Sequence, residues 1–113
     1  MATVAVGRQA EAAVGSYLEK QGFKIIAKNW RTKICEIDLI AQKEDVIYFV
    51  EVKYRGSESQ GSGFEYIGPQ KLGRLKFAAR VWTQSSGWEG DYRIYGAEVT
   101  GPDFETVELV EIE

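Results

Sequence analysis

The spacing of apolar residues predicts two helices. Between residues 7 and 21 apolar positions recur at the interval of one buried helix face, and Gly22 is a typical residue just past a helix end. A second helix is predicted over residues 69–84, because Pro69 suits the first turn. The side chains expected to face inward are Ala10, Ala13, Val14, Tyr17 and Leu18 in the first helix, and Leu72, Leu75, Ala79 and Trp82 in the second.

Five segments rich in β-branched and aromatic residues predict strands. The polar residues 42–45 are expected to turn the chain between the second and third strands, which makes these two a hairpin. The first strand is expected within residues 23–33, centred on 24–30, and the others at 35–41, 46–54, 92–100 and 105–112.

This order of elements, αβββαββ, predicts an α/β fold with a mixed sheet. A length of 113 residues suits one domain covering the whole chain, 1–113. The helix between the third and fourth strands permits a right-handed crossover, so these two strands are expected to be parallel. Residues 55–63, with three glycines and three serines, are expected to form a mobile loop.

Composition narrows the class of protein. A hydrophobic content of 44% and a charged content of 27% are typical of a folded globular domain. No apolar run approaches the roughly 20 residues that span a bilayer, and the first residues lack the basic start of a signal peptide. The single cysteine, Cys35, forms no internal disulfide and favours a reducing compartment. We therefore expect a cytoplasmic protein without a membrane partner.

The net charge of −3 conceals an uneven distribution. The residues before Glu98 include 14 basic and 11 acidic side chains, whereas the rest include six acids and no base. Residues 20–33 carry five bases and no acid. This pattern is compatible with phosphate binding on one face. It is equally compatible with ordinary solvated strand and loop surface, which is the commoner cause.

Acidic residues occur on both strands of the predicted hairpin. Side chains alternate along a strand, so Glu36 and Asp38 are expected on one face of the second strand, opposite the apolar residues 37 and 39. Glu51 and Lys53 likewise share a face of the third strand. Cross-strand neighbours in a hairpin come within roughly 5 Å, so carboxylates and one ammonium are expected to converge. Buried charges are expensive unless they pair with each other or bind a metal.

This arrangement suits phosphodiester hydrolysis. Carboxylate oxygens bind hard divalent cations such as Mg²⁺ or Mn²⁺, and Lys53 could orient a water or stabilise a developing oxyanion. Glu11 borders the apolar stripe of the first helix and could reach such a metal, or simply remain a partly exposed side chain. The absence of histidine excludes histidine-based nuclease mechanisms. The alternative is a plain ion pair between Asp38 and Lys53, worth under ~1 kcal/mol.

Asp38 followed by Glu51-Val52-Lys53 resembles the metal-site signature of the restriction-endonuclease-like PD-(D/E)xK superfamily. More narrowly, the chain is similar to the YraN-like proteins, small bacterial proteins of poorly defined function and predicted nuclease fold. A weaker similarity to archaeal Holliday-junction resolvases rests on the early glutamate, the aspartate and the Glu-x-Lys strand. The segments that carry the YraN-like resemblance are 7–11, 29–31, 36–41, 49–55 and 71–79.

The resemblance implies a restriction-endonuclease-like fold and metal-dependent cleavage of structured or branched DNA. Asp38 and Glu51 would then bind Mg²⁺ or Mn²⁺, with Glu11 completing the metal site, and Lys53 would be the catalytic lysine. A branched substrate cut at two places would favour a homodimer. The residues implied to lie near the nucleic-acid backbone are Arg8, Arg31, Arg55 and Lys71.

Three positions depart from these patterns and leave other functions open. Ile37 stands where the superfamily signature has proline, although the YraN-like pattern shares the isoleucine. Cys35 stands where that family usually has glycine, and Tyr95 where it has aspartate. A catalytically inactive nucleic-acid-binding module of the same fold is therefore the second hypothesis. A protein-interaction domain that pairs through its acidic last strand is the third.

Tryptophans offer one further candidate for binding. Trp88 lies in a glycine-flanked loop and is expected to be exposed, where it could stack on an unpaired base. Trp82 fits the apolar stripe of its helix and is assigned to the core.

Overall fold

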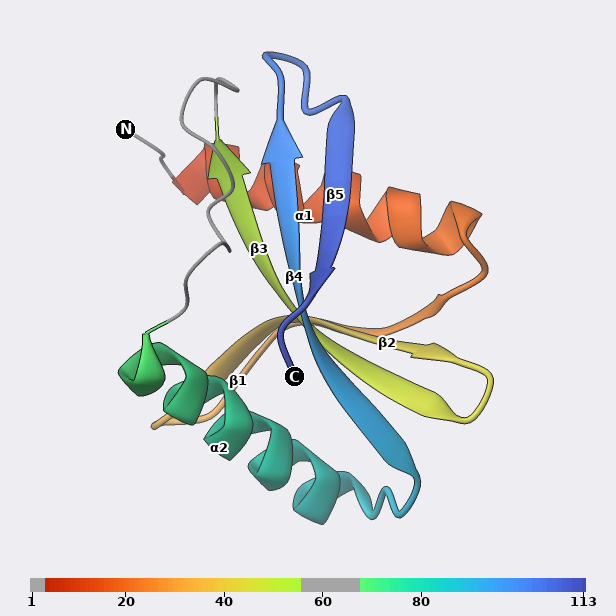
Figure 1. Cartoon of the computed structure of the whole chain (residues 1–113), viewed down its shortest axis with the longest axis vertical. Coiled ribbons are helices and arrows are strands. Elements are labelled where there is room, and N and C mark those ends of the chain that lie inside the picture. The colour runs from red at the N-terminus through yellow and green to blue at the C-terminus, as the bar shows by residue number, and fades with distance from the viewer. Residues whose placement is uncertain (1–3, 56–67) are drawn as a thin grey trace.

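The computed structural model describes residues 4–55 and 68–113. Within these ranges two helices and a five-stranded sheet follow the predicted order αβββαββ (Figure 1). Neither helix is long and apolar enough to cross a membrane. Most of the predicted 55–63 loop lies outside the described residues. The elements are α1 Val4–Lys20, β1 Lys24–Arg31, β2 Glu36–Lys43, β3 Val46–Arg55, α2 Pro69–Ser86, β4 Asp91–Thr100 and β5 Thr106–Glu111.

The strands lie side by side in chain order, from β1 to β5. β3 and β4 are parallel, as the crossover through α2 predicted, and all other neighbours are antiparallel. A tight turn at residues 44–45 closes the β2–β3 hairpin. Its ladder runs only from Lys43–Val46 to Leu39–Val50. Beyond that last pair the two strands part, and Asp38 on β2 and Glu51 on β3 are the next residues. We call this place the strand fork.

Two apolar clusters attach the helices to opposite faces of the sheet. Along β3, Val50 packs in the cluster of α1, whereas Ile47 and Phe49 pack in the cluster of α2. Figure 1 shows α1 crossing behind β3, β4 and β5. Of the residues predicted to face inward, Ala10, Val14, Leu18, Ala79 and Trp82 are buried, and Ala13, Tyr17, Leu72 and Leu75 are half-buried.

Two sequence-based expectations about side-chain placement are wrong. Ile37 and Leu39, expected on one face, pack in different clusters. The β2–β3 ladder ends at Leu39, and Ile37 lies beyond that end, where β2 pairs with β1 alone. Trp88, expected to be exposed, is half-buried against the α2 cluster. Its ring nitrogen Nε1 donates a hydrogen bond of 3.0 Å to the carbonyl of Asp91, which satisfies the polar end of the indole.

The turn between β4 and β5 depends on a glycine. Gly101 has a φ of +96°, in the left-handed region that costs other residues about 1–2 kcal/mol. An added Cβ would also meet the carboxylate of Glu105, whose Oε1 accepts a hydrogen bond of 2.9 Å from the N–H of Asp103. We expect Gly101→Ala to lower the free energy of unfolding by about 1–2 kcal/mol in urea denaturation.

The matched control is Gly73→Ala, inside α2, where an added Cβ would meet no atom within 4 Å. There alanine replaces glycine in a regular helix and should stabilise the protein by about 0.5–1 kcal/mol. A change of the same sign in the free energy of unfolding of both variants would contradict a need for glycine at this turn.

Candidate metal and nucleic-acid site

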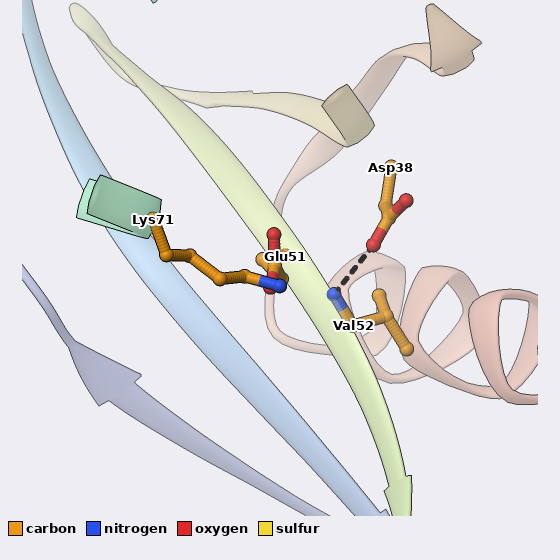
Figure 2. Close-up of polar contacts among 4 residues, drawn as sticks. All are labelled: Asp38, Glu51, Val52 and Lys71. Atoms are coloured by element: carbon orange, nitrogen blue, oxygen red, sulfur yellow. Dashed lines mark hydrogen bonds and ion pairs between the residues drawn. The ribbon is translucent and has the colours of Figure 1, made fainter. Parts of the chain in front are cut away.

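Asp38 is fixed at the strand fork by a backbone hydrogen bond. Its Oδ2 accepts the N–H of Val52 at 2.8 Å (Figure 2). The β2–β3 ladder has already ended at Leu39–Val50, so this side-chain contact takes the place of a missing strand pair. The carboxylate thereby ties β2 to β3 where their backbones part.

The surroundings of Asp38 are strongly acidic. Burial raises the pKa of its carboxyl from 3.8 to about 6. The hydrogen bond from Val52 opposes this shift, whereas the negative charges of Glu11, Glu51 and Glu36 add to it. Carboxylates from α1, β2 and β3 therefore all raise the pKa of the same group. A cleft carboxylate perturbed by burial and by like charges is a candidate functional group.

Glu51 is contacted by a lysine from the second helix. Nζ of Lys71 lies 2.5 Å from Oε2 of Glu51, and the two side chains are 48% and 17% exposed. Figure 2 shows Lys71 approaching β3 from the side opposite Asp38. Lys71 stands in the first turn of α2, where the positive end of the helix disfavours a cation. The resemblance implied a role for Lys71 near the substrate backbone, whereas here its direct contact is a candidate metal ligand.

Glu11 contributes a buried carboxylate oxygen. Its Oε1 is buried and accepts no hydrogen bond from the described residues. A buried carboxylate oxygen without a partner is costly, and a cation would relieve it. Within residues 4–55 and 68–113 no three such side chains are already grouped as a metal site, and Lys71 contacts Glu51. The donors themselves are the hard oxygens that Mg²⁺ and Mn²⁺ prefer, so the residues fit such an ion.

A groove beside the strand fork brings four of the predicted site residues together. Asp38 and Glu51 line it together with Arg31 and Lys71, and its volume is about 780 Å³. Arg8 and Arg55, the other two predicted backbone contacts, are not among its lining residues. Arg8 is exposed on α1, and Arg55 ends β3.

Lys53 occupies a different position from the one expected. It is exposed and does not line the groove, although strand alternation puts it on the same face as Glu51. Its register partner on β4 is Glu98, a buried acid that sequence reasoning missed. Lys53 and Asp38, both described residues, form no ion pair, because the β2–β3 register brings Glu51 and not Lys53 opposite Asp38. The alternative of a cross-strand ion pair is therefore wrong.

The walls of the groove come from two segments that lie apart in the sequence. The turn between β1 and β2 supplies Lys33 and Ile34, and α2 supplies Arg74 and Phe77. Lys71, Arg74 and Phe77 are three residues apart, a spacing that places side chains on one helix face. That signal was present in the sequence. Local patterns could not predict that the turn between β1 and β2 lies beside this helix face and forms a groove with it.

Comparison with known proteins identifies the family. Residues 10–108 match the sequence model described as uncharacterised protein family UPF0102. The chain belongs to this family. A UPF0102 protein of Alkaliphilus metalliredigens is 43% identical over 95 residues, which cover 83% of each chain. A UPF0102 protein of Vibrio campbellii is 40% identical over 91 residues, covering 78% of this chain and 75% of the relative.

The stretch that matches UPF0102 includes Glu11, Asp38, Glu51 and Lys53. The family description and the names of these two relatives state no activity. The similarity to YraN-like proteins and to PD-(D/E)xK nucleases therefore stays a prediction from the sequence.

Proposed function

We propose that this UPF0102 protein is a metal-dependent endonuclease that hydrolyses phosphodiester bonds in structured or branched DNA. The observation that carries the proposal is the acidic strand fork. There Asp38 has a pKa raised to about 6 by burial, with the charges of Glu11 and Glu51 adding to the shift. The buried oxygen of Glu11, which accepts no hydrogen bond from the described residues, adds support, since a cation would be a partner for it.

In this proposal Asp38, Glu51 and Glu11 hold Mg²⁺ or Mn²⁺. When bound, such a cation lowers the pKa of a coordinated water and neutralises charge that grows on the phosphoryl group. The bond from Val52 keeps Asp38 in place, so this ligand needs no rearrangement. Lys53 stabilises the developing oxyanion or orients the attacking water. Arg31 and Lys71, both exposed at the groove, attract the phosphate backbone.

The partner is then a nucleic acid, with a homodimer for substrates that are cut on two strands. The proposed location is the cytoplasm, as the single cysteine suggests. Light scattering tests for the homodimer, and cell fractionation tests the location.

Cleavage of end-labelled DNA by purified protein tests the proposal. Linear duplex, flap and four-way-junction substrates are incubated with Mg²⁺, with Mn²⁺ or with EDTA. We expect products only with metal, and a clear loss of products for Glu51→Gln, which keeps the shape of the side chain but removes its charge. Calorimetric titration of Mn²⁺ should show binding to the wild type that is weakened in this variant.

The matched control is Glu108→Gln, an exposed acid on β5, which should cleave like the wild type. Cleavage that persists in EDTA, or that is the same for Glu51→Gln and the wild type, would rule out this chemistry at the fork.

One observation favours a second function, a nucleic-acid-binding module that does not cut. The ammonium of Lys71 already neutralises Glu51, so the site has a charge partner without a metal. This module would bind DNA with strong salt dependence and with no effect of Mg²⁺ or EDTA beyond ionic strength. Metal-dependent cleavage by clean protein would eliminate it.

A further inference from the structure

The groove beside the strand fork has a cationic rim and an acidic base. Its four basic side chains, Arg31, Lys33, Lys71 and Arg74, are all exposed and outnumber the one exposed acid, Glu36, whereas Asp38 and Glu51 are half-buried. Arg31 and Lys33 belong to the end of β1 and its turn, and the other two belong to α2. Positive charge therefore stands on both walls, as a phosphate chain lying along the groove requires.

Two apolar side chains are exposed in the same groove. Ile34 is 74% exposed and Phe77 is 38% exposed, and these are two of the four large hydrophobic residues exposed within the described ranges. Apolar side chains gathered in one concave surface and rimmed by charge mark a binding site. An aromatic ring among cations is the combination that binds unpaired bases and their phosphates.

The turn that carries Ile34 is held by its own hydrogen bonds. Oγ1 of Thr32 accepts the N–H groups of Ile34 and Cys35, both at 3.2 Å. The N–H of Thr32 donates to the carbonyl of Cys35 at 2.8 Å. The isoleucine is thus carried by a turn that its own hydrogen bonds hold, and it lines the groove together with residues of α2.

We infer that this groove binds an unpaired strand of DNA, with phosphates along Arg31, Lys33 and Arg74 and with bases against Phe77 and Ile34. The inference rests on the proposed function and specifies its substrate: the unpaired strand of a flap or junction, not a continuous duplex. A volume of about 780 Å³ lies within the roughly 300–1,000 Å³ of small-molecule sites. Stacking on Phe77 needs an exposed base face, which an unpaired strand offers and a continuous duplex does not.

Fluorescence anisotropy in EDTA, where no cleavage occurs, tests the inference separately from catalysis. The probes are a labelled oligothymidylate and a labelled blunt hairpin of the same nucleotide count, at one ionic strength. We expect the wild type to bind the oligothymidylate about 10-fold more tightly than the hairpin. Phe77→Ala should weaken oligothymidylate binding about 10-fold. Arg74→Ala should weaken the binding of both probes.

Matched controls lie outside the groove on the same molecule. Ile26 on β1 is 38% exposed, like Phe77, but does not line the groove, so Ile26→Ala should bind like the wild type. Arg80 is an exposed cation farther along α2 and serves as the control for Arg74. Ile34→Ser provides a second groove variant whose exposed side chain is dispensable for the core, and it should also weaken oligothymidylate binding.

Equal affinity for the two probes overturns the inference, as does binding of neither probe. So does a Phe77→Ala variant that binds like Ile26→Ala. A preference for the oligothymidylate without any metal-dependent cleavage supports binding of an unpaired strand in the groove and refutes the proposed nuclease activity. Metal-dependent cleavage without such a preference refutes the inferred role of the groove and leaves the proposed nuclease activity standing.

Discussion

Asp38→Asn is expected to abolish metal-dependent cleavage while raising the stability of the metal-free protein. The amide oxygen of asparagine can still accept the N–H of Val52, so the strand fork keeps its shape. What the variant loses is the negative charge that would bind a divalent cation. We expect the cleavage rate to fall by at least about 100-fold, the order seen when one preorganised electrostatic group is removed from a catalytic site.

The gain in stability follows from the pKa of Asp38. Its value of about 6 in the folded protein lies above the ordinary 3.8, so folding favours the protonated carboxyl. Stability therefore decreases as pH rises from about 4 to about 6, and the full penalty is present above that range. The difference between a pKa of 3.8 and one of about 6 corresponds to roughly 2–3 kcal/mol, at 1.36 kcal/mol per pKa unit. Asparagine does not titrate, so the Asp38→Asn protein should lack most of this loss of stability.

Urea denaturation in EDTA, at pH 4 and at pH 8, measures the effect. We expect Asp38→Asn to be more stable than the wild type at pH 8, by up to about 2 kcal/mol, and nearly equal to it at pH 4. Asp91→Asn, at an exposed position at the start of β4, should show no such pH-dependent difference. An Asp38→Asn protein that is less stable than the wild type at pH 8 would contradict a destabilising charge on Asp38.

The fold was predictable because its signals are local. Apolar spacing located both helices, and the β-branched segments located every strand to within a few residues. Pro69 marked the first residue of α2, and Gly22, with a φ of +95°, follows the end of α1. The parallel pairing of β3 with β4 followed from the helix between them. Each of these inferences needed only neighbouring residues or the order of elements.

The candidate site was predictable only in part, because its geometry depends on distant segments. The sequence showed which acids share strand faces, but not that the β2–β3 ladder ends at Leu39–Val50. Because the ladder ends there, the side chain of Asp38 accepts the N–H of Val52. At the same place Ile37 and Leu39 pack against different helices. The contact between Lys71 and Glu51 likewise joins residues far apart in the chain. No periodicity encodes such a pair.

The two lysines near Glu51 should have separable roles, and substitution of each by alanine tests this. Lys53 has the spacing of the nuclease signature but is exposed, whereas Lys71 directly contacts Glu51. We expect Lys53→Ala to lower the maximal cleavage rate by about 100-fold, because it removes positive charge from the developing oxyanion. Its thermal stability should match the wild type, since an exposed side chain away from the core contributes within about 0.5 kcal/mol.

Lys71→Ala should act on the metal requirement instead. The ammonium of Lys71 and a divalent cation compete for the same carboxylate of Glu51. Without the lysine, half-maximal activity should be reached at a several-fold lower Mg²⁺ concentration, with little change in the maximal rate. Lys71→Gln, which keeps most of the side chain but loses the charge, should behave alike. The reverse pattern, with activity lost in Lys71→Ala and kept in Lys53→Ala, would make Lys71 the lysine that acts on the phosphate. The Glu51-Val52-Lys53 motif would then describe the metal ligand alone.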